Sequence, residues 1–135
     1  MPNANQVEIL RGDVDRWNQW RDSDRTQVPE LRGADLSRAS LVMADLSHAV
    51  LRDADLTLAN MKGADLRYAD LRNANLIGAR LIGVDFEGAD VTGADLSTAE
   101  DLTAEQLELT IGDETTKLPD GMERPPRWSA PYAAR

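Results

Sequence analysis

The sequence predicts an all-β solenoid, in which the chain winds around a column of leucine side chains. Leu, or a residue of similar size, returns at every fifth position from Leu31 to Leu96, in fourteen successive units. Ala stands two residues before each of these positions, except where Pro29 and Val84 replace it. Asp or Asn usually separates the small residue from the large one.

A period of five residues fits neither a helix nor a flat strand. In an α-helix, five residues advance by about 500°, so the leucines would spiral around the axis without forming a stripe. In a strand, side chains alternate between the two faces, so every second leucine would point outward. Each unit is therefore predicted to be a very short Ala-Asp-Leu strand followed by a two-residue corner, with Ala and Leu pointing inward.

The units, which read A-[DN]-L-x-x, resemble those of the pentapeptide repeat family. Internal repetition at a fixed short period is typical of solenoids. The resemblance implies a right-handed quadrilateral β-helix with four units, or twenty residues, in each coil, meaning one full turn of the solenoid. On that basis we expect residues 29–102 to form about three and a half coils.

Residues 1–28 are predicted to form a helical N-terminal cap. Apolar residues from Val7 to Trp17 follow the +3, +4, +3 spacing of a helix, although Gly12 weakens its middle and Asp13 can begin a second short helix. The end of a solenoid exposes apolar core and unpaired backbone, so we expect Val14 and Trp17 to cover it. The Trp-x-x-Trp pair is alternatively a platform for a ligand.

Residues 103–135 are predicted to form a short helix and an extended tail. Thr103 and Gln106 have the spacing of a capping box, which marks the start of a helix. Leu107 and Ile111 are expected to close the second end of the coil. The rest of the segment is Pro-rich and aperiodic, so we expect it to lie extended along the coil.

With four units in each coil, residues twenty apart stack into columns. The expected core stack contains Leu36, Leu56, Leu76 and Leu96 on one side and Leu46, Leu66 and Phe86 on the opposite side. The outward residues of these sides give two acidic columns, one of Asp35, Asp55 and Asp95 with Asn75, and one of Asp45, Asp65 and Asp85. These side chains either accept backbone N–H bonds at the corners or form a row of negative charge that resembles a phosphate backbone.

An arginine column and an apolar patch are also expected on the outside. The column consists of Arg32, Arg52 and Arg72, with acidic neighbours at Glu30, Asp70 and Asp90. The patch, near one corner, consists of Val42, Met43 and Ile82, with Leu58 and Ile77 from the neighbouring face. Such a patch is either an interface or is covered by another segment, and we expect the C-terminal tail to cover it.

Composition excludes several classes of function. The chain has 135 residues, a net charge of −9, no Cys and one His. The acidic balance argues against direct binding to nucleic acid, which needs a basic patch. The absence of Cys excludes disulfides and thiolate metal sites, and His48 has no second His to share a metal, so no metal or cofactor is expected.

The sequence shows no arrangement typical of an enzyme. No general base accompanies the serines, and the carboxylates lie on convex walls that do not exclude water. No apolar run approaches the length of a membrane span and no signal peptide is recognisable, so we expect a cytoplasmic protein without a membrane partner.

The function predicted from the sequence is that of a non-catalytic structural or protein-interaction module, monomeric or weakly dimeric, whose partner is unknown. The alternative is a DNA mimic that binds a topoisomerase such as DNA gyrase, because some members of the family that this chain resembles protect gyrase from quinolones. The short coil, the lack of projecting loops and the arginine column count against this alternative.

Overall fold

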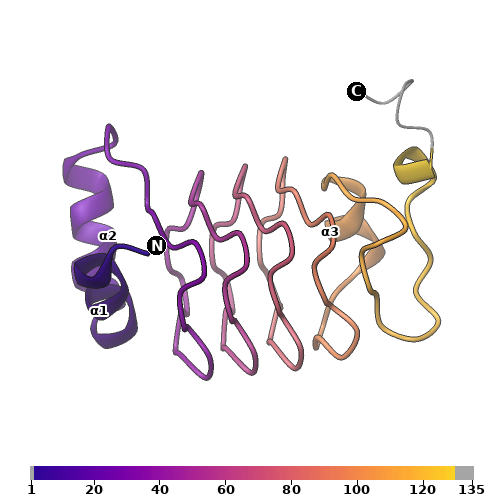
Figure 1. Ribbon diagram of the computed structural model, residues 1–135, viewed down its shortest axis with the longest axis horizontal. Helices are drawn as coiled ribbons and strands as arrows, with labels where there is room; N and C mark the ends of the chain where they lie inside the picture. The colour runs from indigo at the N-terminus through magenta and orange to yellow at the C-terminus, as the bar shows by residue number, and fades with distance from the viewer. Residues whose placement is uncertain (1, 130–135) are drawn as a thin grey trace.

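The computed structural model describes residues 2–129, in which the repeats wind into a coil with helices toward both of its ends (Figure 1). Helices α1 (Ala4–Gly12) and α2 (Val14–Ser23) lie beside the first coil. Helix α3 (Ala104–Glu108) and the 3₁₀ helix η1 (Pro126–Ser129) lie toward the opposite end. The repeat therefore occupies the space between two helical segments.

Successive coils pair through parallel bridges between residues twenty positions apart, from Glu30 with Val50 to Arg80 with Glu100. Among the described residues these pairings are isolated bridges of one residue each. The three-residue Ala-Asp-Leu strands that we expected are therefore not formed. The reason lies in the turns: the Leu31 carbonyl accepts the Ala34 N–H at 3.0 Å, across the corner between two units. Because each large residue gives its carbonyl to a turn, that carbonyl does not pair with the next coil, and the regular ladder is interrupted at every corner.

The corners are turns whose second central residue has a positive φ. Gly33 has φ +70°, and non-glycine residues such as Arg38 and Tyr68 have φ 60° and 59° at equivalent positions. A positive φ there, with a hydrogen bond between the first and fourth residues, is the geometry of a type II turn. The glycines at this position in the repeat have the positive φ that their place in the sequence led us to expect.

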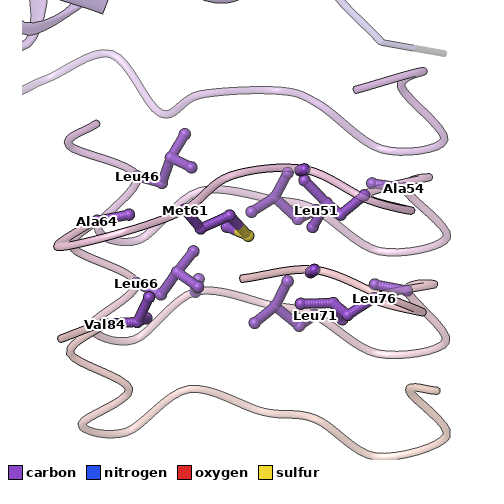
Figure 2. Packing of buried hydrophobic residues seen from close by; sticks show 14 of the residues in the cluster. Leu46, Leu51, Ala54, Met61, Ala64, Leu66, Leu71, Leu76 and Val84 are labelled. Carbon is purple, nitrogen blue, oxygen red and sulfur yellow. The ribbon is translucent and has the colours of Figure 1, made fainter. Parts of the chain in front are cut away.

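The large residues of the repeat form the buried core. Figure 2 shows Leu46 above Leu66 and Leu51 above Leu71, all pointing inward. Side chains of the expected core stack are at most 2% exposed: Leu36, Leu56, Leu76, Leu96, Leu46, Leu66 and Phe86. The core is thus a narrow column, in which each side chain packs on the equivalent residues of the neighbouring coils.

The chain returns to the coil after α3. Ile111 forms a parallel bridge with Asp90, and Lys117 forms one with Asp95, so part of the tail that we expected to be aperiodic is paired in register. Between them Thr116 is fully buried and donates its hydroxyl to the Val91 carbonyl at 3.0 Å. Residues 130–135 of the predicted C-terminal segment lie outside the described residues.

Ile111 does not close the end of the coil as expected. Its bridge with Asp90 places it at an outward position, and its side chain is 39% exposed. Trp128 is buried there instead and donates its indole N–H to the Thr110 carbonyl at 3.3 Å. Gly112 makes room for this ring, because a Cβ at that position would lie 2.7 Å from it.

Candidate interaction surfaces

The carboxylates of both acidic columns bond to the backbone of their own unit. In each unit the Oδ1 atom accepts the N–H of the residue two positions later, at 3.0–3.2 Å; the acceptors are Asp35, Asp45, Asp55, Asp65, Asp85 and Asp95. Asn60 and Asn75 accept the same bond at 3.2 and 3.0 Å. These side chains therefore cap the corners, and this task does not need a charge.

Arginines neutralise the column of Asp45, Asp65 and Asp85. Arg25 Nη1 lies 2.7 Å from Asp45 Oδ2, and Arg67 Nη2 lies 2.8 Å from Asp65 Oδ2. Arg67 Nε is also 3.9 Å from Asp85 Oδ2. Burial alone would raise the pKa of Asp45 and Asp65, but hydrogen bonds from Ser47 and Arg25 to the first, and from Arg67 to the second, lower it.

The column of Asp35, Asp55 and Asp95 keeps more of its charge. Within residues 2–129 none of these three carboxylates forms a salt bridge. Hydrogen bonds from Ser37, whose hydroxyl donates at 2.6 Å, lower the pKa of Asp35. Burial alone would raise the pKa of Asp95, but hydrogen bonds from the Ser97 hydroxyl and N–H lower it. This column is thus the more exposed row of negative charge.

The arginine column is paired with acidic side chains of its own units and of the neighbouring coils. Asp70 lies 3.2 Å from Arg52 and 2.8 Å from Arg72, and Arg72 is also 3.9 Å from Asp90. Arg32 lies 3.7 Å from Asp53, a neighbour that we had not expected. Since exposed pairs of this kind contribute about 0–1 kcal/mol each, their main effect is to cancel charge on this face.

The residues of the expected apolar patch lie at two successive corners, with Val42, Met43 and Ile82 at one and Leu58 and Ile77 at the other, and they remain at least partly exposed. Met43, Leu58 and Ile82 are 64%, 45% and 49% exposed, and Val42 and Ile77 are half-buried. The described part of the tail pairs with Asp90 and with Asp95, at the last coil, and leaves Met43, Leu58 and Ile82 exposed, so it does not cover these residues as we expected. The reason is that bridging to the last coil holds the tail in register there.

Large corner side chains lie over glycines of the following coil. A Cβ built on Gly63 would meet Met43 Sδ at 2.4 Å, and one on Gly88 would meet Tyr68 Cδ1 at 2.3 Å. Leu58 lies over Gly78 in the same way, at 2.6 Å. The sequence analysis missed this packing, although its signal is readable: a glycine stands twenty residues after the large residue.

Side chains of the N-terminal helices bond to the free backbone edge of the first coil. Arg11 donates to the Asp35 carbonyl at 2.9 Å, and the Trp17 indole N–H donates to the Asp45 carbonyl at 2.8 Å. Asn18 accepts the Asp45 N–H at 2.8 Å. Trp17 is fully buried, whereas Val14 is only partly buried against the core.

At the opposite end, α3 begins with the expected capping box of Thr103 and Gln106. Gln106 also donates to the carbonyls of Leu81 and Val84, at 2.9 and 3.1 Å. Leu107 is 1% exposed and packs into the core, as we expected.

A groove with a basic lining lies between the N-terminal segment and one corner of the coil. Its volume is about 520 Å³, and its lining residues are Arg21, Arg25, Gln27, Val28, Pro29, Ser47, His48 and Arg67. Beside it the rings of His48 and Tyr68 stack with centroids 5.2 Å apart. Sequence reasoning missed this groove because it joins two arginines of the helical segment to a corner of the repeat.

The comparisons with known proteins agree with this geometry. The family model described as pentapeptide repeats, in eight copies, matches residues 30–67 and 59–97. The chain belongs to the pentapeptide repeat family. Members of this family fold as right-handed quadrilateral β-helices. No curated protein matches this pentapeptide repeat protein.

Several solved structures of pentapeptide repeat proteins are similar to it. Rfr23 from the cyanobacterium Cyanothece 51142 is 31% identical, over 68% of this chain and 66% of that one, with a TM-score of 0.42. The protein alr5209 from Nostoc PCC 7120 is 32% identical, over 65% of this chain and 74% of that one, with a TM-score of 0.28. QnrB1, a plasmid-mediated fluoroquinolone resistance protein, is 24% identical over 69% of this chain, with a TM-score of 0.54. This chain covers less than two thirds of Rfr23 and 46% of QnrB1.

The described part of this pentapeptide repeat protein holds no group of three or more His, Cys, Asp or Glu side chains able to bind a metal ion. Its described helices are also too short and polar for any of them to cross a bilayer.

Proposed function

We propose that this pentapeptide repeat protein is a non-catalytic module that binds another protein through the outward side chains of its coil. The observation that carries this proposal is the exposure of Met43 and Ile82 along one corner and of Leu58 at the preceding corner, on a backbone that is bonded at every corner. Apolar groups exposed together on a soluble protein are typical of interfaces. Pentapeptide repeat proteins are generally structural modules without enzymatic activity, which supports the same reading.

The proposal includes the finer architecture. The repeat forms about three and a half coils, and the helical segments at the two ends act as caps, which fits a monomer or a weak dimer. Support for the N-terminal cap comes from Arg11, Trp17 and Asn18, whose side chains bond to backbone groups that a preceding coil would otherwise pair. We place the protein in the cytoplasm, where a chain without Cys is at no disadvantage.

Quantitative affinity capture from the native cells tests the module proposal. The full chain is the bait, and a variant with Met43→Ser and Ile82→Ser is compared with a control variant, Arg32→Lys with Thr92→Ser, at the corner that follows Leu31 and Val91. The proposal expects at least one protein that the wild type and the control retain and the apolar-corner variant loses. Capture of the same proteins by all three baits, or of none by the wild type, contradicts it.

The second candidate is a DNA mimic that binds a topoisomerase such as DNA gyrase. The likeness of the fold to QnrB1 favours it, and so does the column of Asp35, Asp55 and Asp95, whose carboxylates form no salt bridge among residues 2–129. The opposite acidic column counts against it, because arginines neutralise Asp45 and Asp65. Supercoiling by gyrase with and without a quinolone decides the matter: a DNA mimic changes the sensitivity at micromolar protein, and an unchanged sensitivity removes this candidate.

A further inference from the structure

The basic groove gives an inference about the chemistry of the partner, which rests on the proposed function. Its lining contains three arginines and His48 but no carboxylate, although the chain carries a net charge of −9. The aspartates that pair with these arginines lie outside the lining. The groove is thus locally basic, although Asp22, Asp45 and Asp65, each within 3.0 Å of one of its arginines, offset part of this charge.

Aspartates of the coil hold two of the arginines in fixed orientations. Arg25 is 2.7 Å from Asp45, and Arg67 donates from both Nε and Nη2 to Asp65, at 3.0 and 2.8 Å. Both arginine side chains are still about half exposed, at 54% and 50%. Because a guanidinium carries five N–H donors, each keeps donors for a further acceptor, and fixing its plane reduces the entropy lost on binding.

Arg21 is a buried cation with incomplete compensation. It is 4% exposed, and its nearest carboxylate, Asp45, lies 3.7 Å away and is shared with Arg25. Arg21 donates to the Ser47 carbonyl at 2.8 Å, but its buried Nε has no hydrogen-bond partner. Burial lowers the pKa of Arg21 despite the attraction of Asp45. A second negative charge in the groove would therefore be stabilised by Arg21.

The size and surroundings of the groove restrict the occupant. A volume of about 520 Å³ suits a few side chains rather than a folded surface. Val28, 54% exposed, and Pro29 form an apolar wall, which suits the aliphatic part of a glutamate. Nucleic acid would extend beyond the groove onto the acidic walls of the coil, where its phosphates would be repelled.

We propose that this groove docks a short acidic segment of the partner protein, whose carboxylates bind the guanidinium groups of Arg25 and Arg67 beside the buried charge of Arg21. Guanidinium groups suit this task because they match the planar carboxylate with paired N–H donors.

Titration of the ¹⁵N-labelled full chain with a peptide containing four glutamates tests this proposal, with the same peptide carrying four glutamines as the control. We expect amide shifts centred on Ser47, His48 and Arg67, absent with the glutamine peptide and weakened by salt. Shifts elsewhere, equal shifts with both peptides, or no binding at millimolar peptide overturn it. Stronger binding of a single-stranded oligonucleotide at the same residues also overturns it.

Variants separate the groove from the rest of the surface. Arg25→Gln with Arg67→Gln is expected to weaken binding by about tenfold or more, whereas Arg32→Gln with Arg52→Gln is expected to leave it unchanged. Because Arg25 and Arg67 also contact the coil, Val28→Glu serves as a second variant that adds a negative charge to the groove and should weaken binding similarly. Equal affinity in the wild type and Val28→Glu contradicts the proposal.

The affinity capture described above distinguishes failure of the acidic-segment proposal from failure of the module proposal. A partner that is retained by Val28→Glu but lost by the apolar-corner variant overturns the acidic-segment proposal and leaves the module proposal standing. Failure of the wild type to capture any protein overturns the module proposal itself.

Discussion

The aspartate of each repeat unit acts first on its own backbone. Asp55 Oδ1 accepts the Thr57 N–H at 3.0 Å, and Asn75, one coil further along the same column, accepts the Ile77 N–H at the same distance. The amide oxygen thus replaces the carboxylate oxygen without a change in geometry. We infer that the repeat needs an acceptor at this position, and that the charge is available for other purposes.

Substitution of Asp55 separates the acceptor from the charge. Asp55→Ala removes the acceptor and is expected to lower the free energy of unfolding by about 0.5–1.5 kcal/mol. Asp55→Asn keeps the oxygen and is expected to remain within about 0.5 kcal/mol of the wild type. Urea unfolding of the three proteins measures both changes, and an equal loss in the Asn and Ala variants would show that the charge matters instead.

Glycine at a corner can serve to adopt a positive φ and to leave room for a side chain of the preceding coil. Gly33 and Gly88 occupy equivalent corner positions and allow the two effects to be measured separately. Gly33 and Gly88 both have φ +70°, but a Cβ would meet nothing within 4 Å at Gly33 and would lie 2.3 Å from Tyr68 Cδ1 at Gly88. Gly33→Ala is expected to cost about 1–2 kcal/mol of unfolding free energy from backbone strain alone. Gly88→Ala is expected to cost more, because the Tyr68 ring must move.

A double-mutant cycle with Tyr68→Ala provides the control. In the Tyr68→Ala background, Gly88→Ala should cost about as much as Gly33→Ala does in the wild type. If Gly88→Ala and Gly33→Ala cost the same in the wild type, the overlying ring places no demand on the corner.

At the level of elements, side chains of the N-terminal helices bond to backbone groups of the first coil that no other coil pairs. Helix α1 ends at Gly12, and Asp13 caps the N-terminus of α2 by accepting the Arg16 N–H at 3.0 Å. This break lets α1 and α2 take different directions, so that Arg11 and Trp17 reach carbonyls on different parts of the first coil. The pairing needs of the coil end are met by side chains rather than by backbone.

Deletion of residues 1–22 tests this role of the helices. The truncated chain exposes the carbonyls of Asp35 and Asp45 and the apolar core, so we expect self-association or loss of solubility. Light scattering after size exclusion, together with thermal unfolding, measures the outcome. A soluble monomer that still unfolds cooperatively would contradict the capping role.

The features that could be predicted from the sequence are those that depend on the spacing of a few residue types within one segment. Burial of Leu36 and Leu56, positive φ at Gly33 and the capping box of Thr103 all follow from local spacing. The isolated bridges were missed because their length depends on how the turns use the carbonyls. The burial of Trp128 and the exposure of Ile111 were missed because the tail has no periodic pattern that predicts which side chains face the core.

The basic groove was not predictable for a different reason. Arg21 and Arg25 belong to the helical segment, whereas His48 and Arg67 belong to the repeat, and spacing within either segment does not position one against the other. Their meeting depends on how α2 packs on the coil. The columns within the repeat, by contrast, followed directly from the twenty-residue coil that the resemblance implied.

In the whole molecule, stacking of the coils aligns the aspartates of successive repeat units into columns of negative charge. The resulting stability should depend on pH through the aspartates, because the folded state lowers the pKa of Asp35, Asp45, Asp65 and Asp95 below the ordinary value. A lowered folded-state pKa stabilises the folded state above the unfolded pKa, and this contribution is lost as the pH falls through the folded pKa.

We therefore expect a nearly constant free energy of unfolding between about pH 7 and 5, followed by a fall below about pH 4, where unfolded aspartates begin to take up protons. Urea unfolding across this range measures the profile. Asp45→Asn with Asp65→Asn should flatten the fall, and an acid limb that is unchanged in this variant would assign it to other groups.

The central claim is that residues one coil apart are hydrogen-bonded around a common axis. Scalar couplings across hydrogen bonds in the ¹⁵N,¹³C-labelled protein measure this directly. We predict couplings from the amide nitrogens of Leu36, Leu56 and Leu76 to the carbonyl carbons of Asp55, Asn75 and Asp95, whose N···O distances are 2.8, 2.8 and 2.9 Å. Couplings at helical spacing, or none between residues of neighbouring coils, would contradict the account.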